Sequence, residues 1–375
     1  MKKVYLDNAA TTALHPEVVT EMTRVLTEDY GNPSSTHFLG RNSRNLIELS
    51  RKSIAKSLNC SAQEIIFTSC GTEANNFIIQ SSIRDLKINK IITSKIEHHA
   101  VLHTVQILQE QYGIEVEYVN ILPSGEVDII HLTDLLATAD KTLVSLMHIN
   151  NEIGTVLNIE RVAKICKQHH AYFHTDTVQS MGKVTFDLQE TPIDFLVASA
   201  HKFHGPKGIG FAFIRKGIVL NPILLGGEQE KGLRAGTECV HNIVGQAKAL
   251  EIAYSSLIDD EKHITDLKNY TILELNKHIP GVKFNGNTEH TFYNVLNFIL
   301  PFSSDKTAMI LFNLDMKGIA VSRGSACQSG STKPSHVLSE FLSDEDLEKP
   351  SLRVSFSHYN TKEDIDYLIE NLKLV

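Results

Sequence analysis

The chain has 375 residues, of which 42% are apolar and 21% charged, and its formal net charge is −8. This length exceeds what one ordinary hydrophobic core holds, and the composition is that of a soluble globular protein, so we expect two domains. The negative charge argues against nucleic acid or an anionic membrane as the main partner, because both attract basic surfaces. No apolar run is long enough to span a bilayer, and the apolar part of the N-terminus stops at Asp7, too early for a signal peptide.

The first helix is expected after an irregular N-terminal arm. Residues 1–15 are rich in small and hydroxyl residues, and Pro16 stands where the first turn of a helix tolerates proline. An apolar stripe at helical spacing follows, made of Val18, Val19, Met22, Val25 and Leu26. The stretch 30–35 breaks this helix, and a second helix is expected over 41–58.

From Glu64 onward the pattern alternates between short apolar runs and helical stretches. Strands are expected at 65–68, 91–93, 116–119, 143–147, 171–175, 192–198 and 209–214, and a helix opens within 69–74. Strands that alternate with helices predict a mostly parallel sheet covered on both faces, and therefore an α/β fold.

The C-terminal third has a different pattern. Residues 240–278 have helical apolar spacing almost throughout and predict a connection into a second domain. Beyond it, strands are expected at 295–298, 319–321 and 352–354, and helices at 308–316 and 362–373. We therefore predict a large α/β domain over 16–255, and a smaller α+β domain formed by 1–15 and 256–375.

Polar side chains follow two neighbouring strands of the predicted sheet. Asp176 and Gln179 come after the strand at 171–175. Ser199, His201 and Lys202 come after the next strand, ahead of a glycine-rich turn. Ligands of open α/β sheets bind at the carboxyl ends of the strands. A lone lysine there is usually a solvated surface residue, but an amine beside a carboxylate suits pyridoxal phosphate (PLP).

Four further residues could contribute to such a site, although most of them also have an ordinary structural explanation. Gly71 and Thr72 follow a strand and begin a helix, which makes either an anion site or a simple N-cap. Thr237 adds a hydroxyl in a glycine-rich setting. His98 could stack on a flat cofactor and move protons, or be a hydrogen-bonded core histidine.

Two groups of histidine and cysteine residues raise the question of a metal. They are His98, His99 and His103, and Cys166 with His169, His170 and His174. Neither group has the ligand spacing of a known zinc pattern, so we expect no metal.

Among the five scattered cysteines, Cys327 stands apart. The chain has no C-x-x-C pair and no disulfide framework, which indicates a reducing cytoplasm. Cys327 lies in a loop of small and polar residues, at about 322–334, which suits a movable nucleophile. The other cysteines are expected to be small buried hydrophobic residues. Arg353, in an apolar strand, either clamps a carboxylate or faces outward.

Several motifs in one order resemble the cysteine desulfurases of the NifS/IscS type, in the class-V aminotransferase group of fold-type-I PLP enzymes. They are Tyr5–Thr12, Gly31–Ser35, Glu97–His98, His148–Gly154, Ser199–Lys202, Arg234–Thr237 and Gly324–Cys327. The resemblance spans nearly the whole chain. It implies the PLP-dependent transferase fold of type I, with a large domain and a smaller α+β domain that carries the cysteine loop.

The resemblance also implies how PLP is held. Lys202 would carry PLP as a Schiff base and then act as the base at the substrate Cα, with His98 over the ring. Asp176 would pair with the ring nitrogen and Gln179 with the phenolic oxygen. The phosphate would be held by Gly71, Thr72, Ser199 and His201, with Thr237 from the partner subunit of a homodimer.

The substrate residues follow from the same resemblance. Asn151, which also adjoins the cofactor, and Arg353 would receive the carboxylate of L-cysteine, with Asn8 nearby. Cys327 would attack the substrate sulfur, which gives L-alanine and an enzyme persulfide. The sulfur would pass to an acceptor protein, either an iron–sulfur scaffold or an enzyme of thio-cofactor or tRNA thiolation.

The chain departs from the family pattern in two places. Arg323 stands where the family often has serine, and its charge would favour the thiolate or contact an acceptor. The chain ends at Val375, without the longer tail that housekeeping members use to bind the scaffold. Alternatives are a selenocysteine lyase or aminotransferase of the same fold, and a non-catalytic sulfur-delivery partner.

Overall fold

The computed structural model describes residues 2–137, 141–288, 290–307, 309–324 and 334–374. Its larger part is built on a seven-stranded sheet with the strand order β2-β8-β7-β6-β5-β3-β4. The strands are β2 Ile65–Thr68, β3 Lys90–Thr93, β4 Glu115–Tyr118, β5 Thr142–Ser145, β6 Tyr172–Asp176, β7 Phe195–Ser199 and β8 Gly210–Ile214. Strand β8 runs antiparallel to both of its neighbours, and the other described pairs are parallel.

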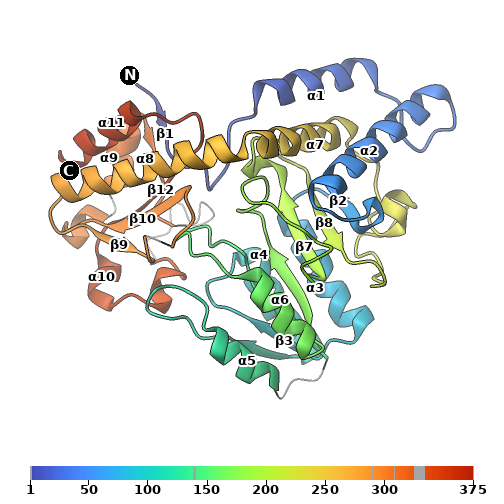
Figure 1. Ribbon diagram of the computed structural model, residues 1–375, viewed down its shortest axis with the longest axis horizontal. Coiled ribbons are helices and arrows are strands. Elements are labelled where there is room, and N and C mark those ends of the chain that lie inside the picture. Colours follow the sequence, from blue (N-terminus) through green and yellow to red (C-terminus); the bar gives the residue numbers. More distant parts are fainter. Residues whose placement is uncertain (1, 138–140, 289, 308, 325–333, 375) are drawn as a thin grey trace.

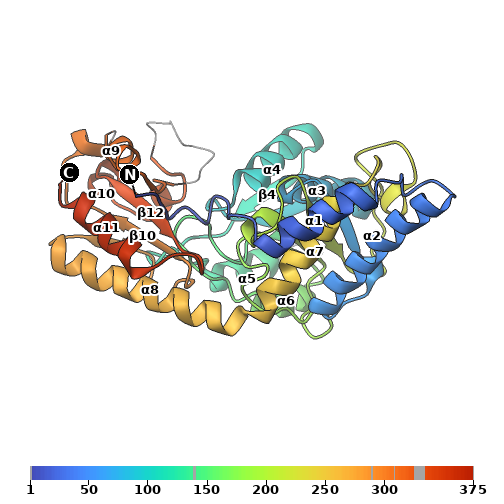
Figure 2. The ribbon, with the colours of Figure 1, turned by 90° about the horizontal axis from the view of Figure 1, so that it is seen from above.

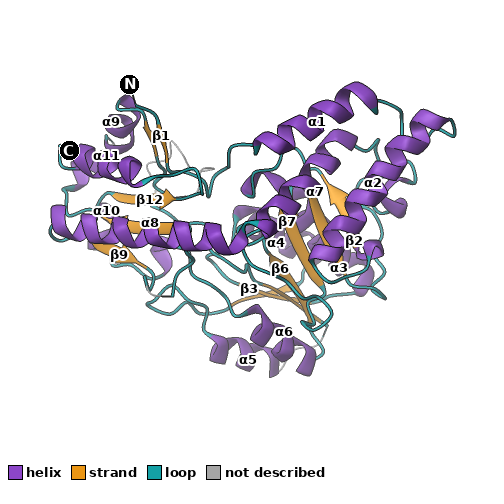
Figure 3. Cartoon of the chain, turned by 45° about the horizontal axis from the view of Figure 1, so that its top comes forward, coloured by secondary structure: helices purple, strands orange, loops and turns teal. Residues whose placement is uncertain are grey.

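Helices cover both faces of this sheet, which explains why its strands are almost continuously apolar. They are α1 Pro16–Glu28, α2 Phe38–Ser57, α3 Gly71–Leu86, α4 His99–Tyr112, α5 Ile129–Ala137, α6 Ile159–Gln168 and α7 Val240–Ser255. Leu196 of β7 packs with the α2, α6 and α7 side, whereas Val197 packs with α3 and α4. Successive strand residues point to opposite faces, so each strand joins two cores. Figure 3 shows the strands as one layer between helices.

The smaller part contains two short sheets and its own hydrophobic core. Strands β9 Lys283–Asn285, β10 Val295–Ile299 and β12 Ser351–Ser355 form an antiparallel sheet, and β1 Val4–Tyr5 pairs in parallel with β11 Ile319–Ala320. The helices are α8 Leu257–His278, α9 Ile310–Met316, α10 Asp344–Glu348 and α11 Lys362–Leu372. Short 3-10 turns lie at Ala62–Glu64, Ala200–Lys202, Gln229–Gly232, Ser304–Thr307 and Leu338–Glu340.

The two parts lie side by side, and helix α8 extends along the smaller one (Figure 1). Seen from above, α8 continues the path of α7 from one part to the other (Figure 2). The two helices meet at Ser256. We retain the division into domains 16–255 and 1–15 with 256–375 as a proposal. It is supported by the separate clusters of buried residues, one of which joins Val4 and Leu6 of the arm to α8, α9 and α11.

The expected α/β fold is confirmed, but one local expectation was wrong. The N-terminal arm is not wholly irregular, because Val4 and Tyr5 pair with β11. The apolar stripe of α1 is only partly a core face: Val18 and Val25 are buried, whereas Val19 is 45% and Leu26 54% exposed. Helix α1 packs mainly on α7, so only one narrow side of it is covered. No helix in the described ranges combines the length and hydrophobicity needed to cross a bilayer.

Candidate active site

A cavity of about 220 Å³ lies at the carboxyl ends of the central strands. Asp176 is the last residue of β6 and Ser199 the last of β7, and Lys202 ends the 3-10 turn that follows. The parallel register pairs Asp176 with Val197, so both polar ends reach the same edge of the sheet. The predicted site residues that line this cavity are Gly71, Thr72, His98, Asn151, Asp176, Gln179, Ser199, His201, Lys202 and Arg353.

The amine of Lys202 is held by the N-terminal arm. Its Nζ donates hydrogen bonds to the carbonyl oxygens of Ala9 and Ala10, both at 2.7 Å. The same arm accepts a bond from Gln179, whose Nε2 lies 2.9 Å from the Ala9 oxygen. The arm therefore forms part of the cavity wall and places the amine at the end of β7.

Both carboxylate oxygens of Asp176 have neutral donors. Oδ2 accepts a bond from Asn75 Nδ2 at 2.8 Å, and Oδ1 accepts one from the Val178 N–H at 2.9 Å. These two bonds fix the orientation of the carboxylate at the end of β6. Asn75 was missed in the sequence. Its signal was its place one helical turn after Gly71, since residues four apart share a helix face.

His98 caps the N-terminus of α4, and this contact determines where its proton lies. Its Nδ1 accepts a hydrogen bond from the Ala100 N–H at 3.1 Å. Burial lowers the pKa of His98, and the positive charge of Lys202 acts in the same direction against the opposing effect of Asp176. The ring is therefore neutral at pH 7 with its proton on Nε2, because Nδ1 must keep its lone pair to accept the bond.

The N-terminus of α3 and the end of β7 form a cradle for an anion. A Cβ on Gly71 would lie 2.7 Å from Val178 Cγ2, so only glycine fits at this position. Ser199 Oγ is buried and has no hydrogen-bond partner among the described residues. Backbone amides at a helix start together with an unpaired hydroxyl are typical of a phosphate site. Burial and then Lys202 lower the pKa of nearby His201 to about 4.

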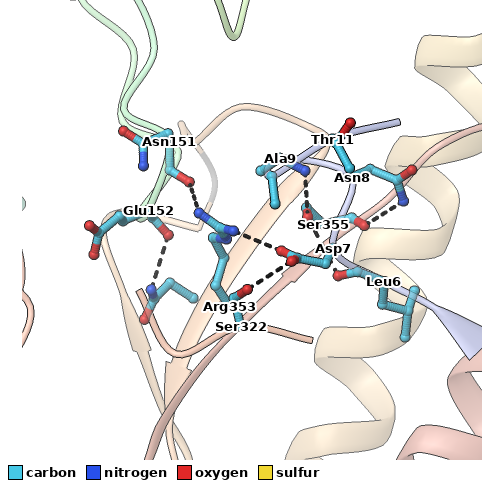
Figure 4. Close-up of polar contacts among 12 residues, drawn as sticks. Leu6, Asp7, Asn8, Ala9, Thr11, Asn151, Glu152, Ser322, Arg353 and Ser355 are labelled. Carbon is cyan, nitrogen blue, oxygen red and sulfur yellow. Dashed lines mark hydrogen bonds and ion pairs between the residues drawn. The ribbon is translucent and has the colours of Figure 1, made fainter. Parts of the chain in front are cut away.

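Arg353 enters the cavity from the smaller part of the protein, on β12. Its side chain is only 1% exposed. Nη1 donates to the Asn151 carbonyl oxygen at 2.9 Å, and Nη2 donates to Asp7 Oδ1 at 2.7 Å (Figure 4). Nε is buried without a hydrogen-bond partner in the described part of the chain. A buried guanidinium with a donor left over fits an incoming carboxylate.

Two of the predicted residues that the structure describes, Asn8 and Thr237, do not line this cavity. Asn8 is buried beside it, and its Nδ2 donates to the Ser355 carbonyl oxygen at 2.9 Å and to Asn360 Oδ1. Thr237 lines a different cavity of about 170 Å³, together with Arg234. Cys327 lies outside the described residues. Arg323, which precedes it, is partly buried, and burial lowers its pKa.

The residues present fit PLP. The cavity offers an amine at Lys202, a carboxylate at Asp176 for a ring nitrogen, and the cradle at Gly71 and Ser199 for a phosphate. Gln179 Oε1 is a second buried oxygen without a hydrogen-bond partner among the described residues. Such unpaired buried polar atoms are costly unless a ligand satisfies them.

The histidine groups considered as metal ligands have other roles. The rings of His99 and His103 stack with centroids 4.7 Å apart, and His98 caps α4. Cys166 lies on α6 with its side chain buried in the core, and burial raises the pKa of its thiol. Within the described ranges, no three His, Cys, Asp or Glu residues are placed to hold a metal ion together.

Comparison with known proteins gives full-length matches. A profile of the class-V aminotransferases matches residues 4–368. The cysteine desulfurase IscS of Dictyoglomus turgidum is 43% identical over 376 residues, which covers 100% of this chain and 94% of that protein. The putative cysteine desulfurase IscS 1 of Bacillus subtilis is 43% identical over 371 residues, which covers 97% and 96%.

Solved structures resemble the whole fold as well. A NifS-like protein has a TM-score of 0.92 at 36% identity, covering 100% of this chain and 99% of that chain. The structure of SspA in complex with cysteine has a TM-score of 0.81 at 30% identity, covering 96% and 100%.

Proposed function

The chain belongs to the class-V aminotransferase family, and from this premise we propose how it works as a PLP-dependent cysteine desulfurase. The enzyme converts L-cysteine to L-alanine and takes up the released sulfur as a persulfide on Cys327. The observation that carries the proposal is the convergence of Lys202, Asp176, His98 and Arg353 on one cavity.

The residues that hold PLP divide by the part of the cofactor that they face. Lys202 would bind the aldehyde carbon, Asp176 would face the ring nitrogen, and Gly71 with Ser199 would hold the phosphate. When bound, PLP supplies the electron sink that weakens the bonds at the cysteine Cα and Cβ. Asn75 and the Val178 N–H each bind one carboxylate oxygen of Asp176 and so fix its orientation toward the ring nitrogen that it would face.

The substrate is oriented by its carboxylate. Arg353 presents an Nε–H that has no hydrogen-bond partner among the described residues, and Asn151 lies beside it. Lys202 Nζ would remove the Cα proton, since it follows β7 and lines the same cavity as Arg353. His98 holds a proton on Nε2 and can donate it while its Nδ1 stays bound to Ala100.

Sulfur transfer requires a soft nucleophile, and the chain offers Cys327. Its thiolate supplies the electron pair of the new sulfur–sulfur bond as the carbon–sulfur bond of the substrate breaks. The electrons of the broken bond remain on carbon, which takes up protons to become alanine. This step needs a free thiol, so we propose the reducing cytoplasm as its compartment. We further propose an acceptor protein that then removes the sulfur.

Replacing the nucleophile tests this assignment. Cys327→Ala should release no sulfide from L-cysteine in the presence of a thiol reductant, while the PLP absorbance band and L-alanine binding are retained. Cys60→Ala is the matched control, since burial raises the pKa of Cys60 to about 12 and it lies outside the cavity. Alanine production at the normal rate by Cys327→Ala would contradict the assignment of the nucleophile. A purified protein without a PLP band after PLP addition would favour a non-catalytic partner.

A further inference from the structure

Asp7 lies directly behind Arg353, although it does not line the cavity itself. It follows β1 on the N-terminal arm and forms a β-bridge with Ser355 of β12. Oδ1 accepts the hydrogen bond from Arg353 Nη2 at 2.7 Å, and Oδ2 accepts one from Ser322 Oγ at 2.8 Å. Figure 4 shows the carboxylate between these two partners. One acid therefore joins β12 to the segment that precedes Cys327.

The two anchored nitrogens fix the plane of the guanidinium. Nη1 is bound to the Asn151 carbonyl oxygen and Nη2 to Asp7, while Nε has no partner among the described residues. Because the guanidinium is planar, fixing two of its nitrogens also fixes the direction of the third N–H. The direction in which Arg353 can receive a carboxylate is therefore set by Asp7 and by the backbone at Asn151.

Backbone contacts make this support rigid. Ser322 N donates to the Arg353 carbonyl oxygen at 3.3 Å, and Arg353 N donates to the Ser322 oxygen at 2.6 Å. Asp7 thus bonds to the side chains of two residues whose backbones are already paired. The side chain of Arg353 is 1% exposed and lines the cavity, whereas that of Asp7 is 16% exposed and does not. The buried cation therefore has its counter-charge on the side away from the cavity.

We propose that Asp7 is a positioning residue that aims Arg353 at the carboxylate of the substrate. This inference rests on the proposed function, in which that carboxylate belongs to L-cysteine. Asp7 acts through hydrogen-bond geometry more than through charge. Its negative charge alone would weaken the attraction between Arg353 and an anion. Removing the charge would therefore strengthen substrate binding, whereas removing the hydrogen bond that orients Arg353 would weaken it.

Two substitutions separate these effects. Asp7→Ala removes both acceptor oxygens and should raise the KM for L-cysteine about 10-fold to 100-fold, the range for a lost hydrogen bond to a charged group, with a much smaller change in kcat. Asp7→Asn keeps an acceptor for Arg353 Nη2, so its KM should lie much closer to that of the wild type. Equal KM values for the two variants, or a KM below that of the wild type, would overturn the proposal.

A second measurement guards against a general structural defect. L-cysteine methyl ester lacks the carboxylate, so Asp7→Ala should bind it as the wild type does, as followed by the change in the PLP absorbance band. Equal losses for the ester and for L-cysteine would mean that Asp7 only stabilises the fold. Asp266→Ala removes an exposed ion pair with Lys262 and serves as the control for loss of a paired aspartate.

Arg353→Ala, measured in parallel, tests the carboxylate clamp separately from the role of Asp7. If it raises the KM and Asp7→Ala does not, the carboxylate clamp stands and the role of Asp7 is wrong. If Arg353→Ala leaves the KM unchanged, the clamp itself fails, and the inference about Asp7 fails with it.

Discussion

Several buried histidines lie in and around the large sheet with pKa values below the ordinary value of 6.5. The pKa is about 4 for His148 and His201 and about 3 for His174, with burial as the main cause in each case. His174 lies inside β6, where its Nδ1 shares a hydrogen bond with Ser145 Oγ at 2.8 Å. These rings are neutral in the folded protein at pH 7 and resist protonation until the pH is well below the value for an unfolded chain.

We predict that the free energy of unfolding decreases as the pH falls below 6.5. In that range the unfolded chain binds protons that the folded protein excludes. The contribution of these histidines to the free energy of unfolding is therefore fully present above pH 6.5 and is lost as the pH falls toward 3. His174→Gln should reduce the slope by about 1.4 kcal/mol per pH unit. Urea titrations from about pH 7 to about pH 4 measure the slope. The exposed His290→Gln should keep the wild-type slope, and an unchanged slope in His174→Gln would contradict the prediction.

At the scale of elements, the residues that flank the cysteine-bearing segment contact one buried acid. Ser335 Oγ donates to Glu152 Oε2 at 2.5 Å, and a Cβ on Gly324 would lie 3.1 Å from the same oxygen. Glu152 directly follows Asn151, whose carbonyl oxygen binds Arg353. Ser335, on the C-terminal side of this segment, is therefore hydrogen-bonded to the residue that follows Asn151.

We predict that Ser335→Ala slows persulfide formation several-fold and leaves L-alanine binding unchanged. The substitution removes the hydrogen bond to Glu152 but no group that contacts the cavity. Trapping the persulfide with an alkylating reagent at short times measures the rate. Ser339→Ala is the control, because its exposed hydroxyl only bonds the Ser335 carbonyl oxygen. Weaker L-alanine binding by Ser335→Ala would show that the contact shapes the substrate site instead.

At the scale of the whole molecule, the position of Thr237 is best explained by a second subunit. The resemblance places this hydroxyl at the phosphate, yet in one chain it lines a cavity other than that of Gly71 and Ser199. Exposed apolar residues on α1, Val19 and Leu26, offer a surface that a subunit contact could cover. We therefore retain the homodimer as a proposal.

Mixing two impaired variants tests this arrangement. The Lys202→Ala and Thr237→Ala variants are combined under conditions that exchange subunits. The mixture should be more active than the summed activities of the separate variants, because one site of each mixed dimer contains both an intact Lys202 and an intact Thr237. Lys202→Ala with Arg353→Ala should give no such recovery, since these residues line the same cavity within one chain. No recovery with Thr237→Ala, although mixed dimers form, would place Thr237 outside the neighbouring site.

The sequence by itself determined the strands of the large sheet and the residues at their carboxyl ends. Lys202, Asp176 and Ser199 could be found because strand periodicity and glycine-rich turns are local signals, and parallel strands end at a common edge. His98 was identified with both of its alternatives, the amine beside a carboxylate suggested PLP, and the resemblance supplied the role of each residue.

Only the tertiary structure decided which distant segments share a contact. Asp7 meets Arg353 across almost the whole chain, and Asn75 reaches Asp176 from another element. Likewise, Val19 and Leu26 have the periodicity of a core face but are exposed, because no described element covers that side of α1. Periodicity records which side of an element is apolar, whereas hydrogen-bond partners and covering surfaces depend on how separate elements pack, and no local pattern encodes that.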